Sequence, residues 1–177
     1  FPMIVIDLPM IFTKLDINPI FKIIGISYIT FRTIQAIVDS HNYGGLTFIE
    51  FTSFLLFPMT LLAGPIDRSY RFQEDLKKGY ENLTLENVGK GWDILILGVL
   101  FKFVIAELVN MFWLSKIDEN SVVFLDMANS AYAYTVYLFF DFAGYSAMAV
   151  GLSIMMGIFI PMNFNHPYLA PNPQDFW

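Results

Sequence analysis

The sequence predicts an all-α protein, a polytopic transmembrane helical bundle with kinked or re-entrant segments. Three observations lead to this fold class: an apolar composition, four long apolar stretches, and a polar segment between the second and third stretches. Of 177 residues, 56% are hydrophobic and 15% are charged, against about a quarter charged in soluble domains. A soluble domain of this size could not bury so much apolar surface, whereas a lipid bilayer acts as an apolar solvent.

The apolar stretches are predicted to be the spans of a single membrane domain, since a helix needs roughly 20 apolar residues to cross the hydrocarbon core. They cover approximately residues 17–38, 48–63, 91–113 and 131–161. The second is short and contains Phe57-Pro58, which breaks or kinks a helix, so a re-entrant or tilted segment is predicted there. The fourth is long enough for two helices broken near 151–157, or for one long tilted helix.

The polar segment 66–90 contains half of the ten lysines and arginines in the chain. Because Lys and Arg in short loops set the orientation of membrane proteins, we expect this segment in the cytoplasm. With this segment inside the cell, the first apolar stretch, 17–38, runs outward, and residues 39–45 are extracellular.

Within the polar segment, two structures are compatible with the pattern. One is a short amphipathic helix at the membrane interface, and the other is a solvated loop. The apolar side of such a helix would consist of Tyr70, Phe72, Leu76 and Tyr80. Thr84, three residues before Asn87, is a weak signal for the N-cap of the next helix.

Several kinds of site are not expected. The net charge of −6 and the lack of a basic run argue against nucleic-acid binding. The sequence has no cysteine, which excludes disulfides, thiol nucleophiles and cysteine-based metal sites. The two histidines do not have zinc-ligand spacing, and no glycine-rich phosphate loop is present. We therefore predict neither a metal nor a cofactor.

Ionisable residues within apolar stretches are costly and are candidates for function. Asp141, in a run of aromatic residues, requires a partner such as Arg32, Lys102, a tyrosine hydroxyl or water. It could handle a substrate or proton, or it could join two helices through Tyr145 or Ser146. Arg32 could pair with Asp141 inside the bundle or extend to the interface along its aliphatic stem.

Two loop segments complete the set of candidates. Asn163, Asn165 and His166 lie in a non-helical stretch typical of a loop that enters a pocket, where His166 could be a general base or only part of the loop. Gly64-Pro65 predicts a sharp turn at the membrane surface, with Asp67 and Arg68 in the headgroup region.

Taken in order, five motifs resemble the membrane-bound O-acyltransferase (MBOAT) family. The resemblance covers nearly the whole chain and is closest to the branch that acts in teichoic-acid D-alanylation. The motifs are Gly-Ile-Ser-Tyr-Ile-Thr-Phe-Arg at 25–32, Ala-Gly-Pro-Ile-Asp-Arg at 63–68, Asp-Phe-Ala-Gly-Tyr-Ser-Ala-Met-Ala-Val-Gly at 141–151, Asn-Phe-Asn-His-Pro-Tyr at 163–168 and Asp-Phe-Trp at 175–177.

The resemblance implies an MBOAT-like fold and an O-acyltransferase in the cell membrane that spans it several times. The family branch moves D-alanine from a thioester on a cytoplasmic D-alanyl carrier protein to a hydroxyl of teichoic acid outside. The implied partners are therefore this carrier, the teichoic-acid acceptor and the lipid bilayer. A thioester is already activated, so catalysis needs a base and positioning in a water-poor tunnel.

The sequence also departs from the family pattern. In the family, Asp-Phe-Trp is followed by an Arg-Trp-His stretch and later by a second key histidine, and His166 matches neither. The resemblance thus predicts a fragment that lacks the catalytic histidines and is inactive alone, with no catalytic residue to assign. Arg32, Asp141 and residues 163–168 are expected to line a tunnel or to support its structure.

Two other functions remain open from the residues. A transporter or channel subunit could use Asp141 with Arg32 or Lys102 as an intramembrane ion pair, although we find no internal repeat typical of transporters. A non-catalytic membrane scaffold could bind a partner through residues 66–90.

Overall fold

The computed structural model describes residues 19–61, 64–65, 67–117, 123–165, 167–172 and 174. Within these residues the secondary structure is helical throughout, with no strand, which confirms the all-α prediction. Two continuous helical rods, Leu85–Lys116 and Phe124–Met155, are long and apolar enough to be candidate membrane spans. They overlap the predicted stretches 91–113 and 131–161, while the spans at 17–38 and 48–63 stay predictions.

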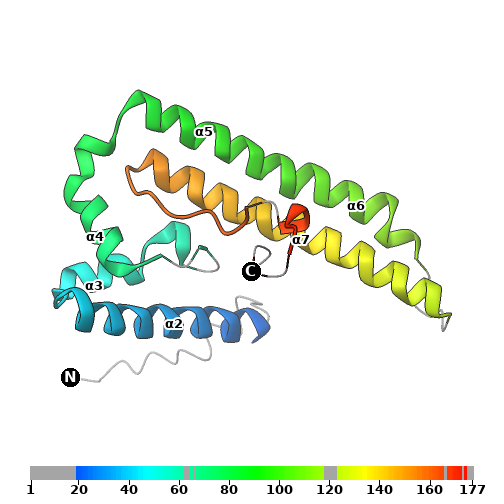
Figure 1. The fold of residues 1–177 in the computed structure, drawn as a ribbon, viewed down its shortest axis with the longest axis horizontal. Helices are drawn as coiled ribbons and strands as arrows, with labels where there is room; N and C mark the ends of the chain where they lie inside the picture. Colours follow the sequence, from blue (N-terminus) through cyan, green and yellow to red (C-terminus); the bar gives the residue numbers. More distant parts are fainter. Residues whose placement is uncertain are drawn as a thin grey trace, which may run out of the picture.

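The long rods lie side by side and run in opposite directions (Figure 1). The first rod is built from α5, the π-helical η3 and α6, and the second is α7. Helix α2 contacts α3 and α4, and the short η1 contacts α7. The elements are α2 Pro19–Tyr43, α3 Phe48–Leu55, η1 Pro58–Thr60, α4 Ser69–Lys78, η2 Gly79–Asn82, α5 Leu85–Val99, η3 Leu100–Ile105, α6 Ala106–Phe112, η4 Leu114–Lys116, α7 Phe124–Met155 and η5 Pro167–Leu169.

Local sequence signals explain where α3 begins and ends. The Thr47 hydroxyl accepts a hydrogen bond from Glu50 N, and the Glu50 carboxylate accepts one from Thr47 N at 2.9 Å, which forms a capping box. The helix ends at Leu55, before Phe57-Pro58, because proline disfavours a helical conformation in the residue that precedes it.

The start of α5 and the end of α7 also follow from local signals. The Thr84 hydroxyl accepts a hydrogen bond from Asn87 N at 3.2 Å, which confirms the predicted N-cap. Helix α7 is one continuous helix that begins at Phe124 and ends at Met155, inside the predicted break region 151–157, and residues 157–161 are not helical. The stretch 131–161 is thus neither two helices nor one unbroken helix. Just beyond the end of α7, Gly157 has φ of +80°, a conformation that favours glycine.

Four glycines allow the two long rods to approach closely. Gly91 and Gly98 on α5 are seven residues apart, as are Gly144 and Gly151 on α7. A Cβ placed on Gly98 would lie 2.7 Å from the carbonyl oxygen of Gly144, and one on Gly91 would lie 2.6 Å from that of Gly151. The equal spacing of seven residues lets both glycine pairs meet in the antiparallel register that is observed.

The π-helical segment η3 shifts this register by one residue. Counting seven from Gly98 leads to Ile105, which is only half-buried, whereas the next residue, Ala106, is 1% exposed. A π-helical turn inserts one extra residue, so the small side chain returns to the contact after the insertion. The same segment carries Lys102, whose ammonium group pairs with the Asp141 carboxylate on α7.

Apart from the contact between the rods, a cluster of buried side chains lies where α2, α3, α4 and the end of α7 meet. It consists of Ala36, Phe54, Phe57, Phe72, Val150, Ile158 and Ile160. The predicted helix in the polar segment exists as α4, but its proposed apolar side is wrong in part. Phe72 is 2% exposed and packs in this cluster, whereas Leu76 and Tyr80 are 43% and 93% exposed. Ser69 and Gln73 are buried beside Phe72 instead.

Residues 39–45 and 66–90 lie at the same end of the bundle, so the prediction that they face opposite sides is wrong. The buried Asp39 carboxylate accepts hydrogen bonds from Ser69 N at 2.8 Å and from the Ser69 hydroxyl at 3.1 Å. The rings of Tyr43 and Tyr70 lie 4.2 Å apart. The chain between them, which contains α3 and η1, leaves this end and returns to it (Figure 1), and an orientation rule that counts charges cannot detect such a return.

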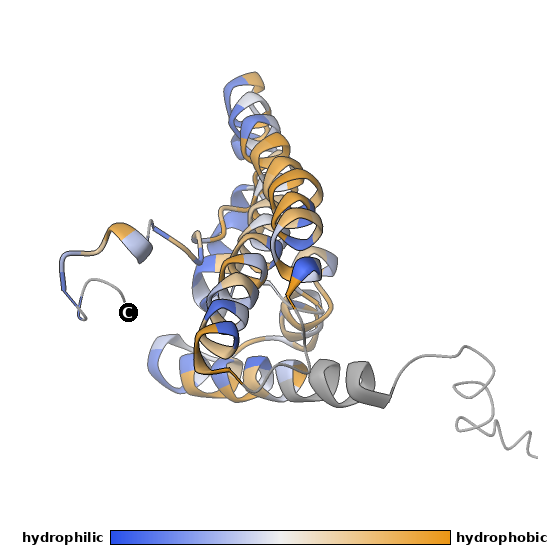
Figure 2. Cartoon of the chain, turned by 90° about the vertical axis from the view of Figure 1, so that its right-hand side faces the viewer, coloured by the Kyte–Doolittle hydropathy of each residue, from blue (hydrophilic) through white to orange (hydrophobic). Residues whose placement is uncertain are grey.

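The long helices expose many large apolar side chains. Figure 2 shows hydrophobic residues distributed along them, interrupted by hydrophilic turns. Examples are Trp92, Ile96, Phe103, Met111 and Phe124, whose exposed fractions are 53%, 50%, 59%, 59% and 79%. Such surface is unfavourable in water and is consistent with contact with lipid.

Candidate functional site

The chain reverses after α7 and runs back along it as a strap, which we define as residues 157–165 and 167–169. Helix α4 holds the start of this strap by binding both the backbone N–H and the backbone carbonyl of Phe159. The Arg71 guanidinium donates to Phe159 O at 2.7 Å, and the Asp75 carboxylate accepts from Phe159 N at 2.8 Å. Asn82 Nδ2 also donates to Gly157 O at 2.9 Å. The polar segment therefore fixes where the strap leaves α7.

Further along, aromatic rings hold the strap against the middle of α7. The ring centroid of Phe164 lies 5.4 Å from that of Phe139 and 5.6 Å from that of Phe142. The Tyr168 ring lies 4.9 Å from Phe139. All three contacts are edge-to-face, the arrangement that aromatic pairs prefer.

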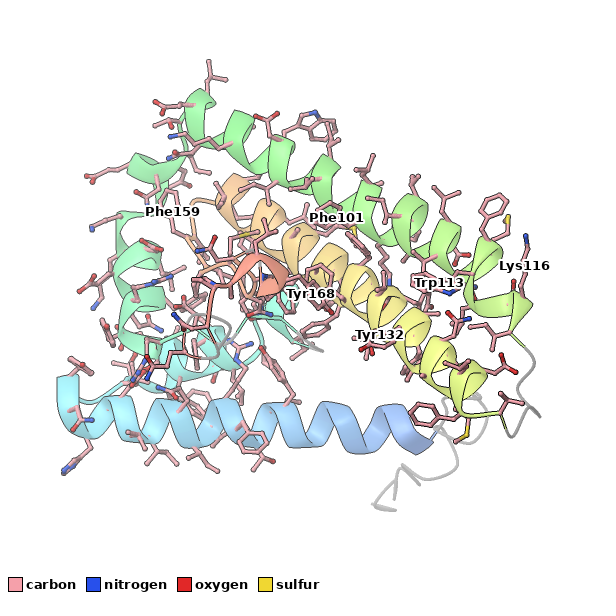
Figure 3. The ribbon with its side chains drawn as sticks, turned by 45° about the vertical axis from the view of Figure 1, so that its right-hand side comes forward. Phe101, Trp113, Lys116, Tyr132, Phe159 and Tyr168 are labelled. Carbon is pink, nitrogen blue, oxygen red and sulfur yellow. The ribbon has the colours of Figure 1, made fainter. Side chains whose placement is uncertain are left out.

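Two cavities flank the strap. The first, of about 710 Å³, lies between the strap and Thr135, Leu138 and Phe142 of α7. The second, of about 540 Å³, lies between the strap, the α5–η3 rod and α7. Phe101 of η3 and Tyr168 of the strap line the second cavity from different elements (Figure 3). Both volumes are in the range of small-molecule sites.

The structure brings some of the predicted site residues to these cavities and not others. Asn163 and Asn165 line both cavities. His166 and the Asp-Phe-Trp motif at 175–177 lie outside the described residues. Tyr145 is half-buried on α7 and, like Asp141, is absent from the lining of both cavities.

Of the partners considered for Asp141, the structure shows Lys102. Lys102, from η3, pairs with it, and the two side chains are 27% and 34% exposed. Arg32 lies elsewhere, so the suggested Arg32–Asp141 pair is wrong. The reason is topological: Lys102 and Asp141 lie on adjacent rods, whereas Arg32 is on α2, which contacts α3 and α4.

Arg32 is 4% exposed and binds the turn that follows α3. Its guanidinium donates to Thr60 O at 3.0 Å, to the Thr60 hydroxyl at 2.6 Å, and to Phe54 O. It also stacks over the Phe54 ring, 4.4 Å from the centroid. The last carbonyls of a helix have no partner within the helix, and Arg32 supplies one to α3. Its role is therefore structural support of the α3–η1 segment.

The Gly64-Pro65 turn is held by α2. The Tyr28 hydroxyl donates to Gly64 O at 2.8 Å. A Cβ on Gly64 would lie 2.7 Å from Thr60 Cα, so only glycine fits there without displacement of the backbone. The sharp turn at Gly64-Pro65 stays a prediction, and the close packing of Gly64 against Thr60 of η1 was not predicted.

The prediction for Asp67 is wrong in one respect, because this residue is only 7% exposed rather than at a solvated interface. Its Oδ1 accepts from Arg68 N at 2.8 Å and lies 3.3 Å from the Arg71 guanidinium. Its Oδ2 is buried and has no hydrogen-bond partner among the described residues. Burial raises the pKa of the Asp67 carboxyl above its ordinary value, although Arg68 N and Arg71 partly oppose this.

The raised pKa predicts how pH affects stability. A carboxyl with a raised folded-state pKa binds its proton more tightly when the protein is folded. Its contribution to the free energy of unfolding is therefore greatest below the unfolded-state pKa and is lost as the pH rises through the folded-state pKa. We expect the wild-type protein to lose stability relative to Asp67→Asn as the pH rises from about 4, the ordinary carboxyl value, through the raised value. Thermal unfolding midpoints in detergent across this range would test this, and a constant difference between the two proteins would contradict it.

Asp39 is the polar residue that sequence reasoning missed. The first apolar stretch was predicted to end at residue 38, with Asp39 in the segment beyond it, but α2 continues to Tyr43. Asp39 is 1% exposed and is bound by Ser69, Gln35 and Arg68. No local pattern indicated this, because its main partner, Ser69, is 30 residues away in the sequence.

The chain is similar to several known proteins, although no family model matches it. It is 38% identical to the teichoic acid D-alanyltransferase of Bacillus subtilis (strain 168), in an alignment that covers 87% of this chain and 40% of that protein. Identity to the enzyme of the same name from Streptococcus thermophilus is 34%, over 96% of this chain and 44% of that protein. The chain thus spans about two fifths of the length of these relatives.

Relatives with other names are also found. The peptidoglycan O-acetyltransferase of Helicobacter pylori is 35% identical over 73% of this chain and 25% of its own length. These similarities confirm the resemblance that the motifs predicted. The aligned part includes the rods, and in the longest alignment nearly the whole chain.

Proposed function

We propose that this protein takes part in the transfer of D-alanyl groups to teichoic acid, on the premise that the chain is homologous to the membrane-bound O-acyltransferases. The observation that carries the proposal is the similarity to three teichoic acid D-alanyltransferases, at 34% to 38% identity over 82% to 96% of this chain. The O-acetyltransferase and alginate O-acetylase relatives, at 32% to 35%, share the general chemistry of acyl transfer to a hydroxyl.

The geometry around the strap supports an acyl-transfer site. In the reaction, the hydroxyl oxygen of the acceptor bonds to the thioester carbonyl carbon, the carbon–sulfur bond breaks, and the thiol leaves with the proton of the hydroxyl. Such a step benefits from a water-poor site that holds both reactants. The second cavity has aromatic walls and two asparagine side chains from the strap, so it offers apolar contact with a few polar groups.

The membrane arrangement is part of the proposal. We infer that the protein spans the membrane several times and that α3 and η1 form a re-entrant segment, because they leave and return to one end of the bundle. Buried contacts of Arg32 with the carbonyls of Phe54 and Thr60 meet the requirement that irregular backbone at membrane depth be covered. The lysines and arginines of segment 66–90 support a cytoplasmic position for this end, where a D-alanyl carrier protein would deliver the thioester.

The test is the ester content of teichoic acid in cells. Deletion of the gene is expected to remove alkali-labile D-alanine from teichoic acid, and the wild-type gene should restore it. Acetyl esters on the cell-wall polymers are measured in the same extracts as a control for a general effect on the envelope. Unchanged D-alanine ester after deletion would reject the proposed substrate, and loss of acetyl ester alone would assign the protein to O-acetylation.

The transporter and scaffold alternatives gain no support from the described residues. Asp141 is paired with Lys102 between two rods packed through glycines, an arrangement that joins helices. Residues 67–90 fold back onto α2, α3 and the strap through hydrogen bonds of Ser69, Gln73, Arg71 and Asp75.

A further inference from the structure

Two charged side chains of α4 bind the backbone of a single strap residue, Phe159. The Arg71 guanidinium donates to Phe159 O at 2.7 Å, and the Asp75 carboxylate accepts from Phe159 N at 2.8 Å. Arg71 and Asp75 are four residues apart, so they lie on the same face of α4. Hydrogen bonds with a charged partner are stronger than neutral ones. We define Arg71 and Asp75 as the clamp, since together they satisfy both backbone groups of Phe159.

Beyond the clamp, the strap has few other polar contacts. Residues 160–165 make no hydrogen bond with any other residue that the structure describes. The next fixed point is Phe164, whose ring packs against two phenylalanines of α7. Asn163, which lines both cavities, lies between the clamp and this ring, and Asn165 follows the ring directly. The clamp therefore sets the direction from which the strap reaches its two asparagines.

The side chains next to Phe159 are anchored in a different way. Ile158 and Ile160 are each 5% exposed and belong to the buried cluster between α2, α3, α4 and the end of α7. Apolar burial has no preferred direction, whereas a hydrogen bond weakens steeply when its angle changes. Burial thus holds this part of the chain against the bundle, and the clamp fixes its orientation. We expect loss of the clamp to shift the strap without unfolding the bundle.

We propose that Arg71 and Asp75 are positioning residues for D-alanyl transfer, an inference that rests on the proposed function. Through Phe159, they hold the asparagines of the strap at the cavities where the thioester and the acceptor hydroxyl meet. Neither charged side chain lines either cavity, so both act through the strap. A misplacement of about 1 Å can slow a reaction by about a hundredfold, so a shifted strap lowers the rate for reactants that are already bound.

Asp75 offers a cleaner test than Arg71. The Arg71 guanidinium also lies 3.3 Å from the buried Asp67 carboxyl, so its removal disturbs a second buried group. Among the described residues, the Asp75 carboxylate has one hydrogen-bond donor, Phe159 N. Asp75→Ala removes this acceptor, whereas Asp75→Asn keeps an oxygen that can accept from Phe159 N. Glu74→Ala is the matched control, because Glu74 is an exposed carboxylate at the adjacent position of the same helix.

The experiment measures transfer to teichoic acid in membranes that contain the complete protein, over a range of concentrations of carrier protein charged with D-alanine. We expect Asp75→Ala to lower kcat by roughly tenfold to a hundredfold and to change KM by less than about threefold. Asp75→Asn should recover most of kcat, and Glu74→Ala should keep it within about twofold. A nitroxide label on Met162→Cys, at a strap position that is 48% exposed, reports the motion of the strap independently of activity. The label should become more mobile in Asp75→Ala and not in Glu74→Ala.

The outcomes separate the two proposals. Absence of transfer by the wild-type protein would reject the proposed function, and the inference with it. Transfer by the wild type with an unchanged kcat in Asp75→Ala would overturn the inference alone, as would an equal loss of kcat in Asp75→Asn. A loss of kcat with unchanged label mobility would also overturn it, since Asp75 would then act by another route. If Asp75→Ala were absent from the membrane, Asn82→Ala gives the same comparison, because it removes the donor to Gly157 O at the start of the strap.

Discussion

Replacement of Gly98 or Gly144 by leucine is expected to separate the two long rods and to lower the free energy of unfolding by about 3 kcal/mol or more. A side chain at either position would meet the backbone of the facing helix, since a Cβ on Gly144 would lie 2.6 Å from Lys102 N and 2.7 Å from Gly98 O. Backbone atoms cannot move aside as a flexible side chain does. The measurements are the amount of monodisperse protein after detergent extraction and its thermal unfolding midpoint.

Gly89→Leu provides the matched control. Gly89 is on the same helix, but a Cβ there would meet nothing within 4 Å. This substitution should raise stability by about 0.5–1 kcal/mol, because glycine lowers the stability of a helix interior. Equal unfolding midpoints for Gly98→Leu and Gly89→Leu would show that the close contact between the rods does not support the fold.

Arg32→Met is expected to destabilise the α3–η1 segment by about 3 kcal/mol or more. The change removes the charged donor from the buried carbonyls of Phe54 and Thr60, and Phe54 O keeps only weaker backbone donors such as Phe57 N at 3.5 Å. Arg32→Lys should recover only part of the loss, since one ammonium cannot reproduce the fork of a guanidinium. Thermal unfolding in detergent and the rate of proteolysis within residues 55–61 would measure the effect.

Arg68→Met is the control for this prediction. The Arg68 side chain is 59% exposed and lies 3.4 Å from Asp39 Oδ1. An ion pair with one partner so exposed contributes little to the free energy of unfolding, so we expect Arg68→Met to lower it by less than about 1 kcal/mol. A loss for Arg32→Met no larger than that for Arg68→Met would mean that the α3–η1 segment does not depend on the buried guanidinium.

Features of the fold that depend on neighbouring residues could be predicted from the sequence. The break at Phe57-Pro58, the cap at Thr84 and the apolar course of α5 and α7 each follow from a few adjacent side chains. Predicted boundaries were less accurate: α7 begins seven residues before the predicted stretch at 131. Helix ends depend on caps and on packing as well as on hydropathy, which explains the difference.

The candidate site could be predicted only in part. The loop character of Asn163 and Asn165 was recognisable, and the structure places both at the cavities. Ser146 was considered only as a possible link between two helices. The tertiary structure shows that its hydroxyl is buried with no hydrogen-bond partner among the described residues, whereas the Ser153 hydroxyl bonds its own helix.

The sequence by itself determined that this protein is helical and apolar, and its motifs indicated the family. Hydropathy, proline and capping residues act over a few positions, so their consequences can be predicted without coordinates. The tertiary structure alone decided which charged groups meet: Lys102 pairs with Asp141, Arg32 binds the end of α3, and Asp39 joins α2 to α4. These partners are 22 to 39 residues apart in the sequence, so only the packing of the elements against one another brings them together.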